Sequence, residues 1–367
     1  MIDNDGVHAA VTATGAVTLA PRLHSIRLTY FQGPNYELAL VLAVQPRKEK
    51  YRIFDMSEFV PAGEQLTEAE SAELNKRDAE ELKRQQLQET STPDEREAVK
   101  LLAGDTLPHP FDFRTAVFGF RGEGEGTRNM LAFELPVSSL KEGFDPATKN
   151  HKFSFDVFAA VKDADGHIVQ KFGLDFPYRV PDDKIAAFRS TSFTFTRPFS
   201  LAPGVYTLQT VVFDKEAKSY SASAIPIDRT GTGVPLTLST PMLVEKVQPA
   251  KNPSDPADPF VVGSNRLVPQ LKNVVPAAHP QVYFVVYPDK ANHEPPTIKI
   301  AFLINGKQMA EQSANLPAPD ANGAIPLTIA AAAQPGECEL RITAIQGSES
   351  VSRTLSYTVA AADVQNQ

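Results

Sequence analysis

One hairpin pattern occurs twice in this chain and constrains its fold more than any other feature. The first copy is a Pro-Gly turn followed by an alternating strand, residues 203–214 (PGVYTLQTVVFD), and the second is residues 335–345 (PGECELRITAI). Each copy is followed by a short turn and a last alternating strand, at 220–227 and 350–359. Alternate residues of a strand share one face, so the repeat indicates two units of one β-sandwich type in tandem.

Composition supports several all-β domains. A length of 367 residues predicts two or three domains at about 150 residues each. Hydrophobic residues at 42% and charged residues at 22% are ordinary for globular proteins, so each domain can bury a core. The 30 prolines are typical of short strands joined by turns and disfavour long helices.

Charge and cysteine content exclude some classes of partner and site. The net charge of −8 argues against binding to nucleic acid or to an anionic membrane surface. A single cysteine excludes an intramolecular disulfide and a thiolate metal cluster, and it fits both the cytosol and a bacterial secreted protein. The sequence has no run of 18 apolar residues, which predicts no membrane span, and its first residues carry no export signal.

Residues 1–61 form the first predicted domain. Short alternating runs at 9–13, 16–19, 23–31, 37–44 and 51–54 predict strands. The stretch IDNDGVH…GAVTLAPRLHSIRLTYFQGPNYELALVLAV resembles the second half of the protective-antigen-type β-sandwich, over about residues 1–55. That module occurs in bacterial toxins, glycosidases and adhesins and has further strands upstream. The resemblance therefore implies that the sequence is a fragment or that its start site is misplaced.

Residues 62–108 are predicted to be a helical connector. A charged run without glycine or proline extends to about residue 89, and Thr67 with Glu70 has the spacing of a capping box. Its apolar stripe is thin, and a second short helix is expected at 94–102. We interpret the segment as a solvated connector, with a dimerising coiled coil as the alternative.

Two immunoglobulin-like sandwiches are predicted after the connector, at 109–246 and 247–362, with a tail at 363–367. Residues 247–259 contain four prolines and are expected to be a stiff linker at the start of the second sandwich. Asn305-Gly306 predicts a two-residue hairpin. Tyr206 occupies a position like that of the tyrosine corner of immunoglobulin-like folds, and Cys338 takes its place in the second copy.

Longer stretches of this region resemble a second family. FSFDVFAAVKDADGHIVQKF…FSLAPGVYTLQTVVFDKEAKSYSASAIPI and PFVVGSNRLVPQL…VYFVVY…IKIAFLINGKQM…PGECELRITA are similar to the C-terminal sandwich region of bacterial von Willebrand factor A-related proteins. The similarity covers about residues 105–360 and consists of strand and turn patterns. The Asp-x-Ser-x-Ser adhesion motif of that family does not occur in the sequence.

A search for chemical motifs predicts no catalytic, metal or cofactor residues. The sequence contains no G-x-S-x-G, H-E-x-x-H, C-x-x-C or P-loop pattern. Gly122, Gly124 and Gly126 are spaced like a phosphate loop, but Glu123 and Glu125 would repel an anion. We expect this stretch to be a hairpin loop.

Two Asp-x-Asp-Gly clusters, at 3–6 and 163–166, are candidate calcium loops. Both lack the first acidic ligand of a helix–loop–helix calcium site and its glutamate at the twelfth position. Turn chemistry is the expected role at 163–166, whereas a calcium or sugar ligand role remains an alternative at 3–6.

Single histidines, the cysteine and four tyrosines complete the candidates. We expect surface or capping roles for the histidines and a buried, inert Cys338. The tyrosines could line a protein or glycan surface or pack in the core. The histidines are His8, His24, His109, His151, His167, His279 and His293, and the tyrosines are Tyr36, Tyr178, Tyr283 and Tyr287.

The sequence therefore predicts an all-β protein of tandem immunoglobulin-like β-sandwiches with a helical connector and a partial N-terminal sandwich. Together with the resemblances, this layout favours a non-enzymatic, extracytoplasmic binding or scaffold module of a bacterial envelope or secreted protein. Protein or glycan is its expected partner, and no cofactor is expected. The alternative is a non-catalytic accessory region of a larger secreted enzyme, such as a glycosidase or protease.

Overall fold

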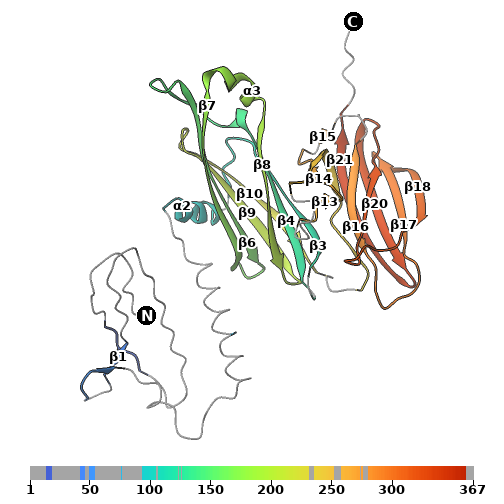
Figure 1. The fold of residues 1–367 in the computed structure, drawn as a ribbon, viewed down its shortest axis with the longest axis horizontal. Helices are drawn as coiled ribbons and strands as arrows, with labels where there is room; N and C mark the ends of the chain where they lie inside the picture. The colour runs from blue at the N-terminus through green and yellow to red at the C-terminus, as the bar shows by residue number, and fades with distance from the viewer. Residues whose placement is uncertain are drawn as a thin grey trace. The chain divides into compact units, whose positions relative to one another are not determined.

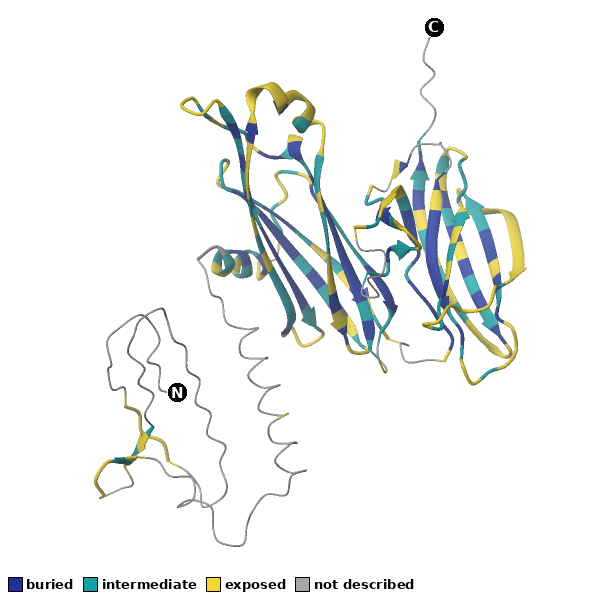
Figure 2. Ribbon diagram, in the orientation of Figure 1, coloured by how far each residue is buried: buried dark blue, intermediate teal, exposed yellow. Residues whose placement is uncertain are grey.

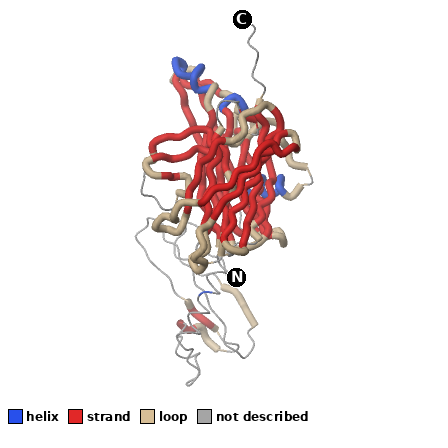
Figure 3. The backbone as a smooth tube through the Cα atoms, turned by 90° about the vertical axis from the view of Figure 1, so that its right-hand side faces the viewer, coloured by secondary structure: helices blue, strands red, loops and turns tan. Residues whose placement is uncertain are grey.

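The computed structural model describes residues 14–18, 42–45, 49–53, 76, 93–104, 106–122, 124, 126–230, 235–251, 258–272, 274–275 and 280–360. The chain divides into two compact units, Met1–Ala79 and Glu80–Gln367. Strands account for most of the described residues, and the helices are short (Figure 3). The prediction of an all-β fold is confirmed.

In the first unit, β1 (Ala43–Val44) pairs antiparallel with β2 (Arg52–Ile53). β1 is the end of the strand predicted at 37–44, and β2 lies within the strand predicted at 51–54. The other predicted strands and the connector's capping box at Thr67 lie outside the described residues.

The first described element of the second unit is α2 (Pro93–Leu102), close to the predicted helix at 94–102. The last part of the connector is docked, because Ala98 and Leu102 are buried against a sheet of the first sandwich. The expectation of a solvated segment is therefore wrong for α2, which lies beside β9 (Figure 1).

The first sandwich packs a three-stranded sheet on a five-stranded one. The smaller sheet has the order β3 (Arg114–Arg121), β4 (Thr127–Pro136), β8 (Ser192–Leu201). In the larger sheet the central β6 (Asn150–Asp163) pairs with β7 (Ile168–Pro181), β9 (Val205–Asp214) and β5 (Gly143–Asp145), and β10 (Ser219–Asp228) extends it beyond β9. The short helices η2 (Val137–Ser139), η3 (Asp182–Lys184) and α3 (Ile185–Arg189) lie in the connections.

The second sandwich also has two sheets. In the first sheet the order is β11 (Thr237–Leu238), β16 (Gln281–Tyr287), β12 (Met242–Pro249), β14 (Asn265–Pro269), β13 (Val261–Val262), with β19 (Ile325–Ala330) also on β16. In the other it is β15 (Val274–Val275), β21 (Glu349–Val359), β20 (Gly336–Gln346), β17 (Thr297–Ile304), β18 (Lys307–Asn315). β11 and the start of β12 precede residue 247, so the second sandwich starts earlier than predicted. Pro249 is part of β12 rather than of a linker.

Residue alternation explains why the two faces of β4 belong to different cores. In β4, Leu131, Phe133 and Leu135 face the five-stranded sheet, whereas Met130 and Ala132 belong to a different cluster. That cluster also contains Met242, Phe260, Leu267, Tyr283 and Val285 of the second sandwich. Buried and more exposed residues alternate along much of β9 and β20 (Figure 2). The two sandwiches are therefore joined by an apolar interface core, which contains these residues together with Phe118 and Phe120 of β3.

The two hairpins that repeat in the sequence occupy equivalent places. β9 pairs with β10, and β20 pairs with β21, each directly after its Pro-Gly turn. The Asn305-Gly306 hairpin is confirmed, since both residues have positive φ, 47° and 77°, between β17 and β18. Gly336 also has φ of 131°, which a residue with a side chain rarely adopts.

Candidate functional site

A hollow of about 560 Å³ on the outer face of the five-stranded sheet is the candidate binding site. Strand register creates it. Gly173, Phe158, Val211 and Ala222 lie in one row across β7, β6, β9 and β10. α2 packs on this row with Ala98.

The next row across the same four strands carries charged and aromatic side chains. Its members are Asp175, Asp156, Phe213 and Tyr220. The ring of Phe213 stacks on that of Tyr220, with centroids 4.3 Å apart and 16° between planes. All four side chains line the hollow, of which they form one wall.

Lys215, just after β9, joins the two carboxylates of this wall. Its Nζ lies 2.8 Å from Asp156 Oδ1 and 3.0 Å from Asp175 Oδ1. Burial raises the pKa of Asp156, and the nearby Asp175 adds to this effect, although Lys215 acts in the opposite direction. The pKa of Asp175 is lowered by its hydrogen bond from Lys215. Although burial opposes it, the two carboxylates raise the pKa of Lys215.

At its other end the hollow is lined by an ion pair between a helix and a strand. Lys171 Nζ of β7 lies 3.0 Å from Glu95 Oε1 of α2. Both side chains are largely covered, with 21% and 14% exposed. The pair is neutral overall, so the excess charge of the hollow resides in the opposite wall.

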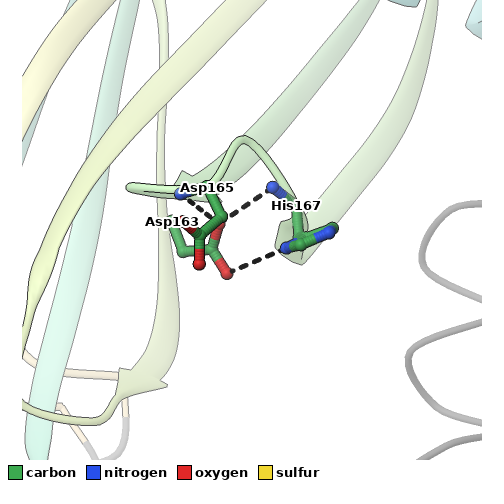
Figure 4. Close-up of side chains that lie close together, drawn as sticks. All are labelled: Asp163, Asp165 and His167. Carbon is green, nitrogen blue, oxygen red and sulfur yellow. Dashed lines mark hydrogen bonds and ion pairs between the residues drawn. The ribbon is translucent and has the colours of Figure 1, made fainter.

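The candidate calcium loop at 163–166 is a hydrogen-bonded turn (Figure 4). Asp163 Oδ1 accepts hydrogen bonds from the amides of Asp165, at 3.1 Å, and His167, at 2.8 Å, and Asp163 Oδ2 lies 3.6 Å from His167 Nδ1. Gly166 has φ of 83°. The side chains of Asp163, Asp165 and His167 are the only described group that the geometry could offer to a metal ion. The backbone bonds of Asp163 account for the cluster as turn chemistry.

His151 departs most from expectation, because it is buried between two carboxylates. Its Nδ1 lies 2.6 Å from Glu142 Oε1 and its Nε2 lies 2.8 Å from Asp182 Oδ1. Arg189 Nε donates to the other oxygen of Glu142 at 2.8 Å. The bond to Asp182, with Glu142 adding to it, raises the pKa of His151 although burial opposes it. The predicted surface or capping role is wrong for this histidine.

The remaining described candidates lie in local contacts or at the surface. His109 lies 3.1 Å from Ser221 Oγ, and His293 is exposed. Gly122 donates to Gly126 O in the β3–β4 hairpin, which confirms the loop prediction. His8, His24, His279, Tyr36 and the cluster at 3–6 lie outside the described residues.

The structure shows which of three candidate tyrosines lie at the surface and which are buried. Tyr178 is 39% exposed and packs on Phe193, with ring centroids 4.5 Å apart. Tyr283 is buried in the interface core and donates to Pro259 O at 2.9 Å. The ring of Tyr287 lies 5.2 Å below the guanidinium of Arg121. The surface role is therefore excluded for Tyr283.

Membrane insertion through a helix has no support in the described part of the chain, where none of the helices has the length and apolar character needed for a span. No family model matches the chain. No curated protein matches it. Among solved structures, the β-glucuronidase of Parabacteroides merdae, with glycerol in its active site, aligns at 8% identity and a TM-score of 0.21. The alignment covers 63% of this chain and 28% of that one, so this chain spans less than a third of its length. At that score, the likeness indicates neither family nor function.

Proposed function

We propose that this chain is a non-enzymatic binding and scaffold module of a bacterial envelope or secreted protein, and that it engages a protein or glycan partner. The observation that supports the proposal is the interface core, which joins two sandwiches through apolar faces that each would otherwise expose. Such a joint fixes the distance between loops and edges on separate sandwiches. A fixed spacing of surfaces is what a scaffold supplies.

Arg121 extends the interface beyond apolar contact. Located at the end of β3, it donates to Thr237 Oγ1 at 3.0 Å and to Tyr287 O at 3.1 Å, and also to Pro235 O and Pro288 O. Gly119 of the same strand exchanges two bonds with Thr240, through its amide and its carbonyl oxygen. Hydrogen bonds from a charged donor contribute about 1.5–3 kcal/mol each. Because hydrogen bonds are directional, these contacts orient the two sandwiches, which burial of apolar area alone would not do.

The scaffold part of the proposal is tested by Arg121→Met. We expect a loss of about 2 kcal/mol or more in the free energy of unfolding, with faster hydrogen exchange at β3 and β16. Arg179→Met is the matched control, because Arg179 is exposed on β7. Equal behaviour of the two variants would show that Arg121 does not hold the sandwiches together.

The binding part is tested with the full chain on glycan and peptide arrays, followed by mass spectrometry of the recovered ligand. We expect saturable binding that leaves the ligand's mass unchanged. Conversion of a ligand, abolished by substitution of a described residue, would instead make the protein an enzyme. Fractionation of the native protein with the cytosol would contradict the proposed location.

A further inference from the structure

The hollow beside α2 is open where a side chain would normally fill it. Gly173 lies opposite Phe158 on the outer face, and a Cβ built on Gly173 would meet no atom within 4 Å. Phe158 and Val211 form an apolar floor beneath this opening. The hollow therefore accepts an apolar group without displacing protein atoms.

The wall beyond the floor has two carboxylates for one ammonium group. Asp156 and Asp175 share Lys215, which leaves one net negative charge. The carboxylate of Asp156 is 22% exposed, that of Asp175 is 62% exposed, and both line the hollow. An entering cation would be attracted to this wall, and an anion would be repelled.

The stacked rings next to the carboxylates add to the attraction for a cation. Phe213 lies directly opposite Asp156 in the strand register, and its ring is only partly buried. Aromatic faces attract ammonium and, more often, guanidinium groups. An apolar floor leading to aromatic and acidic groups matches a ligand with an apolar stem and a cationic head.

We propose that this hollow binds a basic side chain, arginine or lysine, presented by a protein partner. The inference rests on the proposed binding function and favours a protein over a glycan as the ligand. The methylene stem lies along Phe158 and Val211, and the cationic head lies at Asp156 and Asp175 beside Phe213. A neutral sugar could stack on the rings but would leave the excess negative charge uncompensated.

The experiment uses the full chain and three short peptides that differ at one central residue: arginine, its neutral isostere citrulline, or glutamate. Binding is measured by calorimetry at low and at high salt. We expect the arginine peptide to bind at least about tenfold more tightly than the citrulline peptide, with salt weakening the difference. The glutamate peptide should not bind.

Two kinds of variant place the binding in the hollow. Gly173→Leu fills the opening and should abolish binding, with Gly173→Ala intermediate. Asp156→Asn with Asp175→Asn should weaken the arginine peptide by about tenfold or more while leaving the citrulline peptide unchanged. Asp165→Asn, in the β6–β7 turn, is the control for loss of a carboxylate outside the hollow and should bind as the wild type. Thermal unfolding checks that each variant is folded, and the alanine variant keeps the test informative if leucine perturbs the sheet.

Other results would overturn the inference. Equal affinity for arginine and citrulline peptides, or unchanged binding by folded Gly173→Leu, would exclude the hollow as a cation site. Binding of a neutral oligosaccharide that is lost in Gly173→Leu would assign the hollow to glycans instead. If the arginine peptide fails while array binding persists, this inference is wrong and the proposed function stands. If array binding also fails, the binding part of the proposed function is wrong as well.

Discussion

Replacing Phe260 with alanine tests whether the two sandwiches depend on each other. Phe260 is fully buried in the interface core, where its ring meets Phe118 and Phe120 edge-on, with centroids 5.7 and 5.9 Å away. The guanidinium of Arg266 lies 5.6 Å from the same ring. Removing a buried phenylalanine costs about 3–5 kcal/mol. Two aromatic pairs, each contributing about 0.5–1.5 kcal/mol beyond area, place the expected loss in the upper half of that range.

Calorimetry and hydrogen exchange of the full chain measure this effect. In the wild type we expect the two sandwiches to unfold together, because each covers an apolar face of the other. In Phe260→Ala their transitions should separate, and amides of β3, β4 and β16 should exchange faster while those of β20 and β21 stay protected. Met309→Ala is the control, since Met309 is 54% exposed on β18 and should change stability by less than about 0.5 kcal/mol.

One pattern would refute the reasoning. If Phe260→Ala lowered protection in β20 and β21 but left β3 and β4 unchanged, Phe260 would stabilise the second sandwich alone. The two sandwiches would then touch at the interface core without stabilising each other, and the scaffold proposal would lose its supporting observation.

Three further substitutions test local networks. Tyr206→Phe and Tyr357→Phe should each lower the free energy of unfolding by about 1 kcal/mol, measured by urea denaturation, because each removes a hydroxyl bond to a backbone carbonyl; unchanged midpoints would show that neither bond stabilises its hairpin. The raised pKa of His151 means that the folded state holds its proton more tightly than the unfolded chain. Its contribution to stability should be complete below the ordinary pKa of 6.5 and lost as the pH rises through the raised value. Urea midpoints of the wild type minus those of His151→Gln, measured across neutral to alkaline pH, should therefore fall with pH, and a flat difference would mean that Glu142 and Asp182 do not hold the imidazolium.

The interface core was predictable in part from the sequence. Residues 130–133 and 282–286 are continuous apolar runs, which are typical of strands buried on both faces. An alternating pattern alone does not reveal burial on both faces, because it assigns one face of the strand to the core and the other to solvent. The prolines between 247 and 259 are typical of a linker, although Pro249 lies at the end of β12, where a missing amide donor is tolerated.

The hollow and the His151 cluster were not predictable, since both depend on strand order and register. Asp156 and Lys215 are brought together by pairing of β6 with β9, and Asp175 by pairing of β6 with β7. Glu142 reaches His151 because β5 pairs with β6, and Asp182 reaches it because β7 pairs with β6. Sequence spacing contains no information about which edges of which strands become neighbours.

The two copies of the repeated hairpin form the same kind of hydrogen bond to the backbone before the Pro-Gly turn, but with different residues. Tyr206 donates to Ala202 O, four residues upstream, as the corner prediction requires. In the second copy, Cys338 is buried, its thiol pKa is raised by burial, and its Sγ lies 3.6 Å from Gln334 O, again four residues upstream.

In the second copy, the tyrosine lies on the second strand of the hairpin. Tyr357 lies directly opposite Cys338 and donates to Ala332 O at 3.1 Å, whereas Ile227 lies opposite Tyr206. Both hairpins thus tie a buried tyrosine hydroxyl to the backbone just before the Pro-Gly turn. The feature that the two sandwiches share is a hydrogen bond from a tyrosine hydroxyl to the backbone before the turn, and the tyrosine that donates it lies on the first strand of one hairpin and on the second strand of the other.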